Sequence, residues 1–338
     1  MTPFARETAG RERAPDNAAD LLRQERTEGY PPEYLLSRVR GRRSRLIRDW
    51  RPLIYDASPV DYLSSPQYHG FVRERTAEGM WRALLQEHGW IHRQMDETTR
   101  KIFAPYFLYA ELRTIFICLR YLEGDKAQRT GEVLNVSLLS NEVREMLRKG
   151  EVREALYGLE RLFKALSPAE TALPELYERK GLREVERSLT DRYLSFVLKQ
   201  PLHAVLREFF IRIIDSRNIL ALYKSLRVQT AGKGAFLAGG TLKVERLQEI
   251  LEKGDIFAVA GPIRQTAGVS VSSPDPTQVE VALYRGVTRY LREEGRDPLA
   301  AALLLDYLWR ASLEVMNLSL LIAGKDLERE EIAAELVR

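Results

Sequence analysis

An internal repeat constrains the fold of this chain more than any other feature of its sequence. YFLYAELRTIFICLRYL, residues 106–122, aligns without a gap on residues 210–226, at an offset of 104 positions. The same offset places EMLRKGEV, residues 145–152, on EILEKGDI, residues 249–256. Because two separate segments share one offset, we interpret them as parts of one duplicated structural unit.

Each copy of the repeat carries an acid followed, three positions later, by a second polar residue. A third, looser copy, LEVMNLSLLIAGK, lies near the carboxyl end, with Arg310 and Lys325 on the stripe that is apolar in the other copies. On a helix, positions three or four apart share a face, so each pair interrupts an apolar stripe. The three pairs are Glu111 with Thr114, Asp215 with Asn218, and Glu314 with Asn317.

The periodicity of the chain is helical almost throughout. Most long segments have apolar residues three or four apart, Pro, Gly and Ser fall between these segments, and no convincing alternating strand is present. We therefore predict an all-α protein of three similar helical lobes, related by a pseudo-threefold internal repeat. The repeat units should span residues 29–138, 139–242 and 243–338, after a flexible charged tail at residues 1–28.

The acids of the repeat need partners if they are buried. A buried carboxylate costs several kcal/mol unless it is hydrogen-bonded or paired. Their recurrence favours a structural role, in which each acid ties its helix to neighbouring backbone or to an arginine; the alternative is a ligand or proton site. Because Glu111, Asp215 and Glu314 recur in repeated units, we expect three separate, equivalent positions rather than one cluster.

Motifs of known chemistry are incomplete in this chain. GKGAFLAGGT, residues 232–241, has the spacing of a phosphate-binding loop, but Gly240 stands where that loop needs a lysine, and no strand precedes it. His88 and His92 have the spacing of two metal ligands on a helix, but no acid stands between them in the required place. We predict no catalytic residue, no metal, no cofactor and no small-molecule substrate, and hence no enzyme.

Cysteine content and hydropathy indicate a soluble protein in a reducing compartment. The single cysteine, Cys118, lies on an apolar helical face, and one cysteine cannot build a disulfide scaffold. A membrane-spanning helix needs roughly 20 apolar residues. The best candidate, LAAALLLDYLW, is shorter than this and is interrupted by Asp306. The amino terminus carries acids and no apolar core segment, so we expect no signal peptide.

The charge of the chain is high but nearly balanced. Its 52 basic and 48 acidic residues give a net charge of +4, which indicates a charged surface rather than a nucleic-acid footprint. The densest basic run, SRVRGRRSRLIRDWR at residues 37–51, is either a solvated helix face or a contact with an acidic partner or lipid headgroups. The arginines that could make such a contact are Arg38, Arg40, Arg42, Arg43 and Arg45.

Several stretches taken together carry a family resemblance. They are YLLSRVRGRRSRLI, the acid-x-x-Asn helices DSRNILALYKSLR and LEVMNLSLLIAGKDLEREEIAAELV, and the GG.L turn at Gly239–Leu242. In this order they resemble the C subunit (AC39, or subunit d) of V-type and archaeal-type rotary ATPases, from about residue 30 to the carboxyl end. The chain departs from the family pattern at Thr114, where an asparagine is usual, and in its added amino-terminal tail.

The resemblance implies a helical funnel whose three lobes surround a central socket. Such a subunit would lie peripherally on the cytoplasmic side of the membrane, between the central-stalk subunits and the proteolipid rotor ring. It would couple the two for ATP-linked proton or sodium-ion transport without hydrolysing ATP, and it would bind no nucleic acid. Two alternatives stay open: a basic helical adaptor or scaffold that binds another protein or RNA, and a helical enzyme that uses the acids as metal ligands.

Overall fold

The computed structural model of the chain describes residues 18–24, 29–55, 76–148, 150–166, 171–228, 236–270, 275–297, 301–324 and 326–337. All elements within these ranges are helices, apart from one isolated antiparallel bridge between Leu22 and Leu139. The predicted all-α fold is therefore confirmed.

Three long helices organise the structure, and each carries one of the acid-x-x-polar pairs: α5 (Glu97–Glu123), α11 (Ala204–Val228) and α15 (Ala301–Ala323). Each long helix follows a shorter one in the chain: α4 (Ala77–Gln94), α10 (Leu182–Val197) and α14 (Pro276–Glu294). The other α-helices are α1 (Pro32–Arg43), α2 (Arg51–Tyr55), α6 (Thr130–Leu134), α7 (Asn141–Arg148), α8 (Val152–Leu166), α9 (Leu173–Lys180), α12 (Val244–Lys253), α13 (Ala260–Ala267) and α16 (Arg329–Glu335). Three short 3-10 helices are η1 (Ala18–Leu21), η3 (Ala127–Arg129) and η4 (Ile256–Val259).

Local signals in the sequence begin and end these helices. The side chains of Thr76, Asp96 and Asp275 accept hydrogen bonds from the first turns of α4, α5 and α14, which satisfies backbone N–H groups that have no partner within the helix. At the ends of α7 and α12, Gly150 and Gly254 have positive φ angles of 94° and 67°. These two glycines are 104 positions apart, so the repeat preserves the helix stop as well as the helix.

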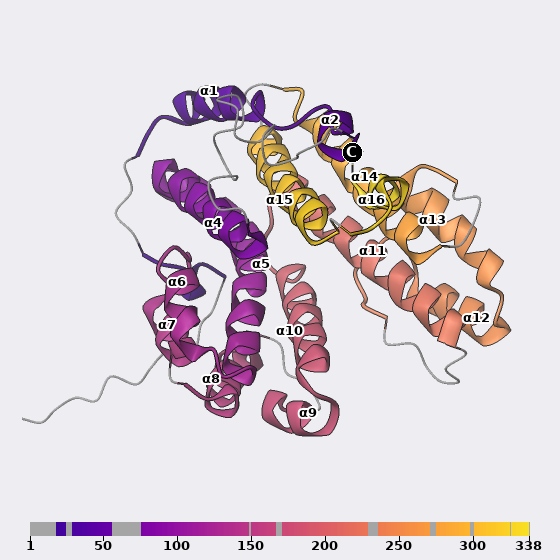
Figure 1. Cartoon of the computed structure of the whole chain (residues 1–338), viewed down its shortest axis with the longest axis horizontal. Coiled ribbons are helices and arrows are strands. Elements are labelled where there is room, and N and C mark those ends of the chain that lie inside the picture. The colour runs from indigo at the N-terminus through magenta and orange to yellow at the C-terminus, as the bar shows by residue number, and fades with distance from the viewer. Residues whose placement is uncertain are drawn as a thin grey trace, which may run out of the picture.

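The short helices pack against long helices in a cyclic order. α10 packs against α5, α14 packs against α11, and α4 packs against α15, which is the last long helix of the chain (Figure 1). Each short helix thus contacts the long helix that belongs to the preceding copy, and the first copy contacts the third. This order joins the beginning of the chain to its end.

Aromatic side chains fill the region where the long helices meet. The Phe209 ring lies 5.7 Å from that of Tyr106 and 5.6 Å from that of Trp309, between ring centroids, so it links α11 to both α5 and α15. The indole N–H of Trp309 donates to the Thr288 hydroxyl on α14 at 2.9 Å. This buried aromatic cluster packs the three long helices against one another.

Part of the predicted amino-terminal tail is ordered against the loop that follows α6. Leu21 and Leu22 are buried, and the Arg23 N–H donates to the Leu138 carbonyl at 2.7 Å. Residues 18–24 therefore do not fit the predicted flexible tail, because the apolar cluster Ala18, Leu21 and Leu22 provides enough buried surface to hold them. The rest of that prediction, at residues 1–17 and 25–28, lies outside the described residues.

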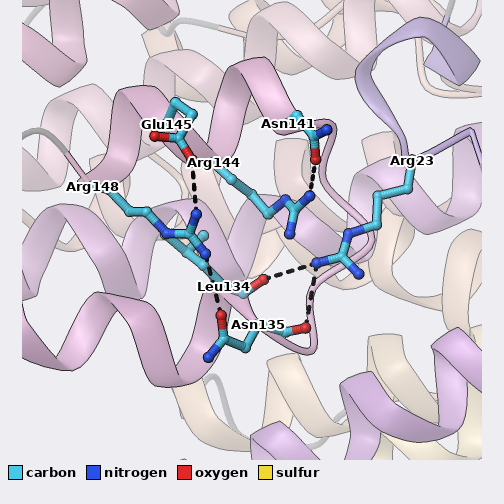
Figure 2. Close-up of polar contacts among 7 residues, drawn as sticks. All are labelled: Arg23, Leu134, Asn135, Asn141, Arg144, Glu145 and Arg148. Atoms are coloured by element: carbon cyan, nitrogen blue, oxygen red, sulfur yellow. Dashed lines mark hydrogen bonds and ion pairs between the residues drawn. The ribbon is translucent and has the colours of Figure 1, made fainter.

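The Arg23 side chain extends this contact. Its guanidinium donates to the carbonyl oxygens of Leu134 and Asn135 at 3.4 and 3.3 Å, as Figure 2 shows. From the other side of the same loop, Arg148 donates to the Asn135 side-chain oxygen at 3.2 Å and pairs with Glu145 at 2.8 Å. The loop after α6 is thus held between the amino-terminal segment and α7.

Among the described helices, α5 is long and apolar enough to cross a membrane, judged by length and composition. Its most apolar window has a mean hydropathy of 1.5, and 67% of that window is buried inside the protein. The strongest candidate is therefore α5 and not LAAALLLDYLW, the run that we predicted from the sequence. A core helix of a packed protein passes the same test, and α5 has that environment.

Candidate functional site

The Asp215 carboxylate binds the turn that follows α11. Its Oδ1 accepts from the Leu242 N–H at 3.1 Å, and its Oδ2 accepts from the N–H and the hydroxyl of Thr241 at 3.0 and 2.5 Å. The turn reaches this buried acid through two glycines. Gly239 has a φ of 102°, and a Cβ added at Gly240 would overlap Asp215 Oδ1. The GG.L turn is therefore shaped to the carboxylate.

The Glu111 carboxylate makes the equivalent contact in the first copy. Its Oε1 accepts from the Leu138 N–H at 2.6 Å, and its Oε2 accepts from the Ser137 hydroxyl at 2.9 Å. Ser137 and Leu138 precede Thr241 and Leu242 by the same 104 positions that separate the two acids. Burial raises the pKa of Glu111, and the hydrogen bonds from Leu138 and Ser137 oppose that rise.

The two asparagines of the repeat hold backbone with both ends of the amide. Asn218 donates to the Leu237 carbonyl and accepts from the Leu237 N–H, both at 2.8 Å. Asn317 donates to the Val337 carbonyl at 2.8 Å and accepts from the Val337 N–H at 3.1 Å. Thr114 stands at the corresponding position of α5, and its single hydroxyl lacks the separate donor and acceptor atoms of an amide.

Glu314 has a different partner from the other two acids. Its Oε2 accepts from the N–H of Ile47 at 2.7 Å, so the third long helix is tied to the amino-terminal part of the chain. Burial raises the pKa of Glu314 to about 7, against the hydrogen bond from Ile47 and the charge of Arg310. About two turns earlier in α15, Asp306 is buried between Arg43 at 3.2 Å and Arg310 at 3.7 Å.

The three acids of the repeat do not form one site. Glu111, Asp215 and Glu314 lie on different helices and each is bound by a different segment of backbone. Within the described ranges, no group of three or more His, Cys, Asp or Glu side chains could hold a metal ion. The arrangement provides hydrogen bonds that tie each long helix to another segment of the chain.

The basic run divides into inward and outward arginines. Arg42 pairs with Glu87 at 2.6 Å, and its guanidinium lies 3.7 Å from the centre of the Trp90 ring. Arg43 pairs with Asp306, as described above. The remaining members of the run that we singled out are exposed: Arg38, Arg40 and Arg45.

The histidine pair and the glycine-rich stretch both make packing or hydrogen-bond contacts within the fold. His88 and His92 are buried on α4 against the Phe107 ring, at 5.9 and 5.3 Å between ring centroids, and burial lowers the pKa of His88 to about 3. Both rings thus belong to the core between α4 and α5. In the glycine-rich stretch, residues 232–235 lie outside the described residues, and the remainder forms the turn that binds Asp215.

A groove of about 740 Å³ lies where α5, α10, α11 and α14 meet, and we call it the four-helix groove. Its floor carries apolar and aromatic side chains, and ion pairs stand along it, such as Arg217 with Asp191 at 2.6 Å. Exposed cations that line it include Arg183 on α10 and Lys224 on α11.

Two kinds of site residue were missed in the sequence. The hydroxyls of Ser137 and Thr241 were detectable, because the offset of 104 aligns them and both precede a leucine. Asp306 was recorded only as an interruption of an apolar run. One partner of Asp306 is Arg310, in the next turn of the same helix, and the other is Arg43, 263 positions earlier. The sequence held no local signal for the contact with Arg43.

The chain belongs to the ATP synthase (C/AC39) subunit family, whose model matches residues 35–335. This confirms the resemblance found in the sequence. The family consists of subunits of V/A-type ATP synthases, so the partners of this chain are subunits of such a membrane-associated complex. No individual curated protein gave a match.

Proposed function

We propose that this chain couples the central stalk of a rotary ATPase to its membrane rotor ring. In this role it lies on the cytoplasmic face, transmits torque and catalyses no reaction of its own. The observation that carries the proposal is the cyclic packing of the short helices on the long ones, α10 on α5, α14 on α11 and α4 on α15. A ring of mutually packed helices resists torsion, because no copy can rotate without disturbing the next.

The three-unit division supports the same role. The ties made by Glu111 and Asp215 match in partner, register and chemistry, and Asn218 and Asn317 hold backbone in the same way. We take these as structural pairs that stiffen three related lobes. Hydrogen bonds to buried charged groups are worth more than those between neutral groups, so each tie stabilises the junction of a long helix with its loop.

We place the foot of the stalk in the four-helix groove. Each of the three predicted units lines it, through Tyr109 of the first, Lys224 of the second and Tyr284 of the third. Burial raises the pKa of Tyr109 and of Tyr284, so both phenols stay uncharged beside a seated partner. The exposed arginines Arg38, Arg40 and Arg45 remain candidates for the contact with an acidic partner surface.

Reconstitution tests this function. Vesicles that contain the complete rotary complex should pump ions on addition of ATP, and omission of this chain should abolish pumping while the detached head still hydrolyses ATP. Within the groove, the double variant Arg183→Glu, Lys224→Glu should lower pumping per ATP hydrolysed. The matched control, Lys253→Glu with Arg264→Glu, reverses two exposed cations on α12 and α13, away from the groove, and should leave coupling unchanged.

Full pumping without the chain would refute the coupling role. Equal pumping by the groove variant and its control would refute only the placement of the stalk, since the chain would still be required.

A further inference from the structure

Arginines from three distant parts of the chain line a second cavity, of about 760 Å³. It lies between the end of α1 with its following loop, the carboxyl end of α14, and α15. We call it the arginine cavity. Its guanidinium groups come from Arg40, Arg43, Arg48, Arg292, Arg296 and Arg310.

The acids of the cavity neutralise only part of this charge. Asp306 is held between Arg43 and Arg310, and Glu314 accepts from the Ile47 N–H. Of the described residues that line the cavity, Glu314 is the one acid beside six arginines, and Asp306 pairs with two of these arginines from outside the lining. Both acids are buried, and burial raises the pKa of each, which favours the uncharged carboxyl group.

Four of the arginines form no direct ion pair in the described part of the chain, although the charge of Arg292 acts on the nearby Asp306 carboxylate. The guanidinium groups of Arg40, Arg48, Arg292 and Arg296 form no ion pair there, and all four side chains are exposed at the cavity wall. Like charges that converge on a concave surface raise its potential and attract an anion. On a convex surface, solvent between the same arginines would weaken their combined attraction for an anion.

We propose that the arginine cavity binds an anion that carries phosphate groups. The planar guanidinium donates two parallel hydrogen bonds to a phosphate, and several guanidinium groups can share one phosphate cluster. The volume lies within the range of sites for small ligands and lipid headgroups. A soluble phosphate compound and the headgroup of an acidic phospholipid share this chemistry. The inference is independent of the coupling role, because it concerns the isolated chain.

Binding to the purified full-length chain tests the site with two probes. Isothermal titration with inorganic pyrophosphate reports a soluble phosphate ligand. Co-sedimentation with phosphatidylcholine vesicles, with and without phosphatidylglycerol, reports a lipid headgroup. Binding of pyrophosphate, or binding only to the vesicles that contain phosphatidylglycerol, supports the proposal and identifies the source of the phosphate.

A pair of arginines in one segment provides the matched control. Arg48 lines the cavity, whereas Arg45, three positions earlier and also exposed, does not. Arg48→Gln and Arg292→Gln should each weaken binding about tenfold, the loss expected for one hydrogen bond to a charged group. Arg45→Gln should bind as the unmodified chain does. Thermal unfolding of the three variants checks that the fold is intact. Arg48 and Arg292 form no ion pair with the described residues, and Arg292 is attracted by Asp306 but repelled by Arg310, so we expect small shifts.

Three outcomes would overturn the proposal. The first is no binding of either probe. The second is an equal loss in Arg45→Gln, which would indicate attraction to the general surface charge. The third is binding of a polyglutamate peptide where neither phosphate probe binds, which would assign the cavity to an acidic protein segment.

Discussion

At the scale of single residues, Asp215 and Glu111 make the same contact with side chains of different length. Aspartate is one methylene shorter than glutamate, so the turn must come closer to α11 than the corresponding loop comes to α5. Gly240 permits this approach, because an added Cβ there would overlap Asp215 Oδ1. At the corresponding position before the Glu111 loop, Val136 is tolerated. We infer that the turn needs glycine at position 240 because the acid it binds is the shorter aspartate.

Gly240→Ala should destabilise the fold through this contact. The methyl group would push the turn away and leave the buried Asp215 carboxylate short of its donors, at a cost of about 1–3 kcal/mol in the free energy of unfolding. Urea denaturation measures the change. Gly41→Ala is the control, since an added Cβ on that exposed position of α1 meets no atom within 4 Å. Equal stability of the two variants would contradict the explanation.

Glu314 makes stability depend on pH. Its pKa is about 7 in the folded chain and 4.5 when solvated, so between these values the folded state binds more protons than the unfolded state. Stability should therefore fall as the pH rises through this window, by about 3 kcal/mol at most. Glu314→Gln keeps an oxygen that can accept from Ile47 and removes the titration.

The measurement is the difference in unfolding free energy between Glu314→Gln and the unmodified chain at pH 5 and at pH 8. The variant should gain stability relative to the unmodified chain at the higher pH, because it avoids the buried charge. A difference that is independent of pH would show that Glu314 does not titrate in this window.

At the scale of elements, the segment at residues 18–24 packs against α5 and forms backbone hydrogen bonds with the loop after α6. We call this segment the clasp. Helical periodicity does not detect such a segment, because seven residues are too few for a pattern and their backbone bonds go to a distant loop. The Ser140 N–H donates to the Leu21 carbonyl at 2.9 Å, and Leu22 is 2% exposed. Burial of these leucines, rather than local propensity, holds the segment.

Leu22→Ala should release this clasp. Truncation of a buried leucine removes contacts and leaves a cavity, which costs about 2–5 kcal/mol. The exchange of the Ser140 amide hydrogen should accelerate together with the loss of stability, since its acceptor lies in the released segment. Gln24→Ala changes an exposed residue two positions later and should shift stability by about 0.5 kcal/mol or less. Slow exchange at Ser140 in Leu22→Ala would show that the clasp does not depend on this leucine.

At the scale of the whole molecule, the order in which the helices pack decides whether the three copies form an open array or a closed one. Three helical copies in a row could stack as an open array, in which the first and last copies never touch. Here α4 packs against α15, and Ile47 is bound by Glu314. Both contacts join early and late parts of the chain, so the first and third copies lie side by side (Figure 1).

The sequence by itself determined the all-α class and the family, because helical periodicity and a repeated motif are local patterns that survive without knowledge of packing. It also marked the polar positions of each long helix. The partners of those positions were decided only by the tertiary structure. Glu314 binds an amide 267 positions away, and the arginine cavity joins α1, α14 and α15. Such contacts depend on which helix faces pack together, and burial, not sequence neighbourhood, selects them.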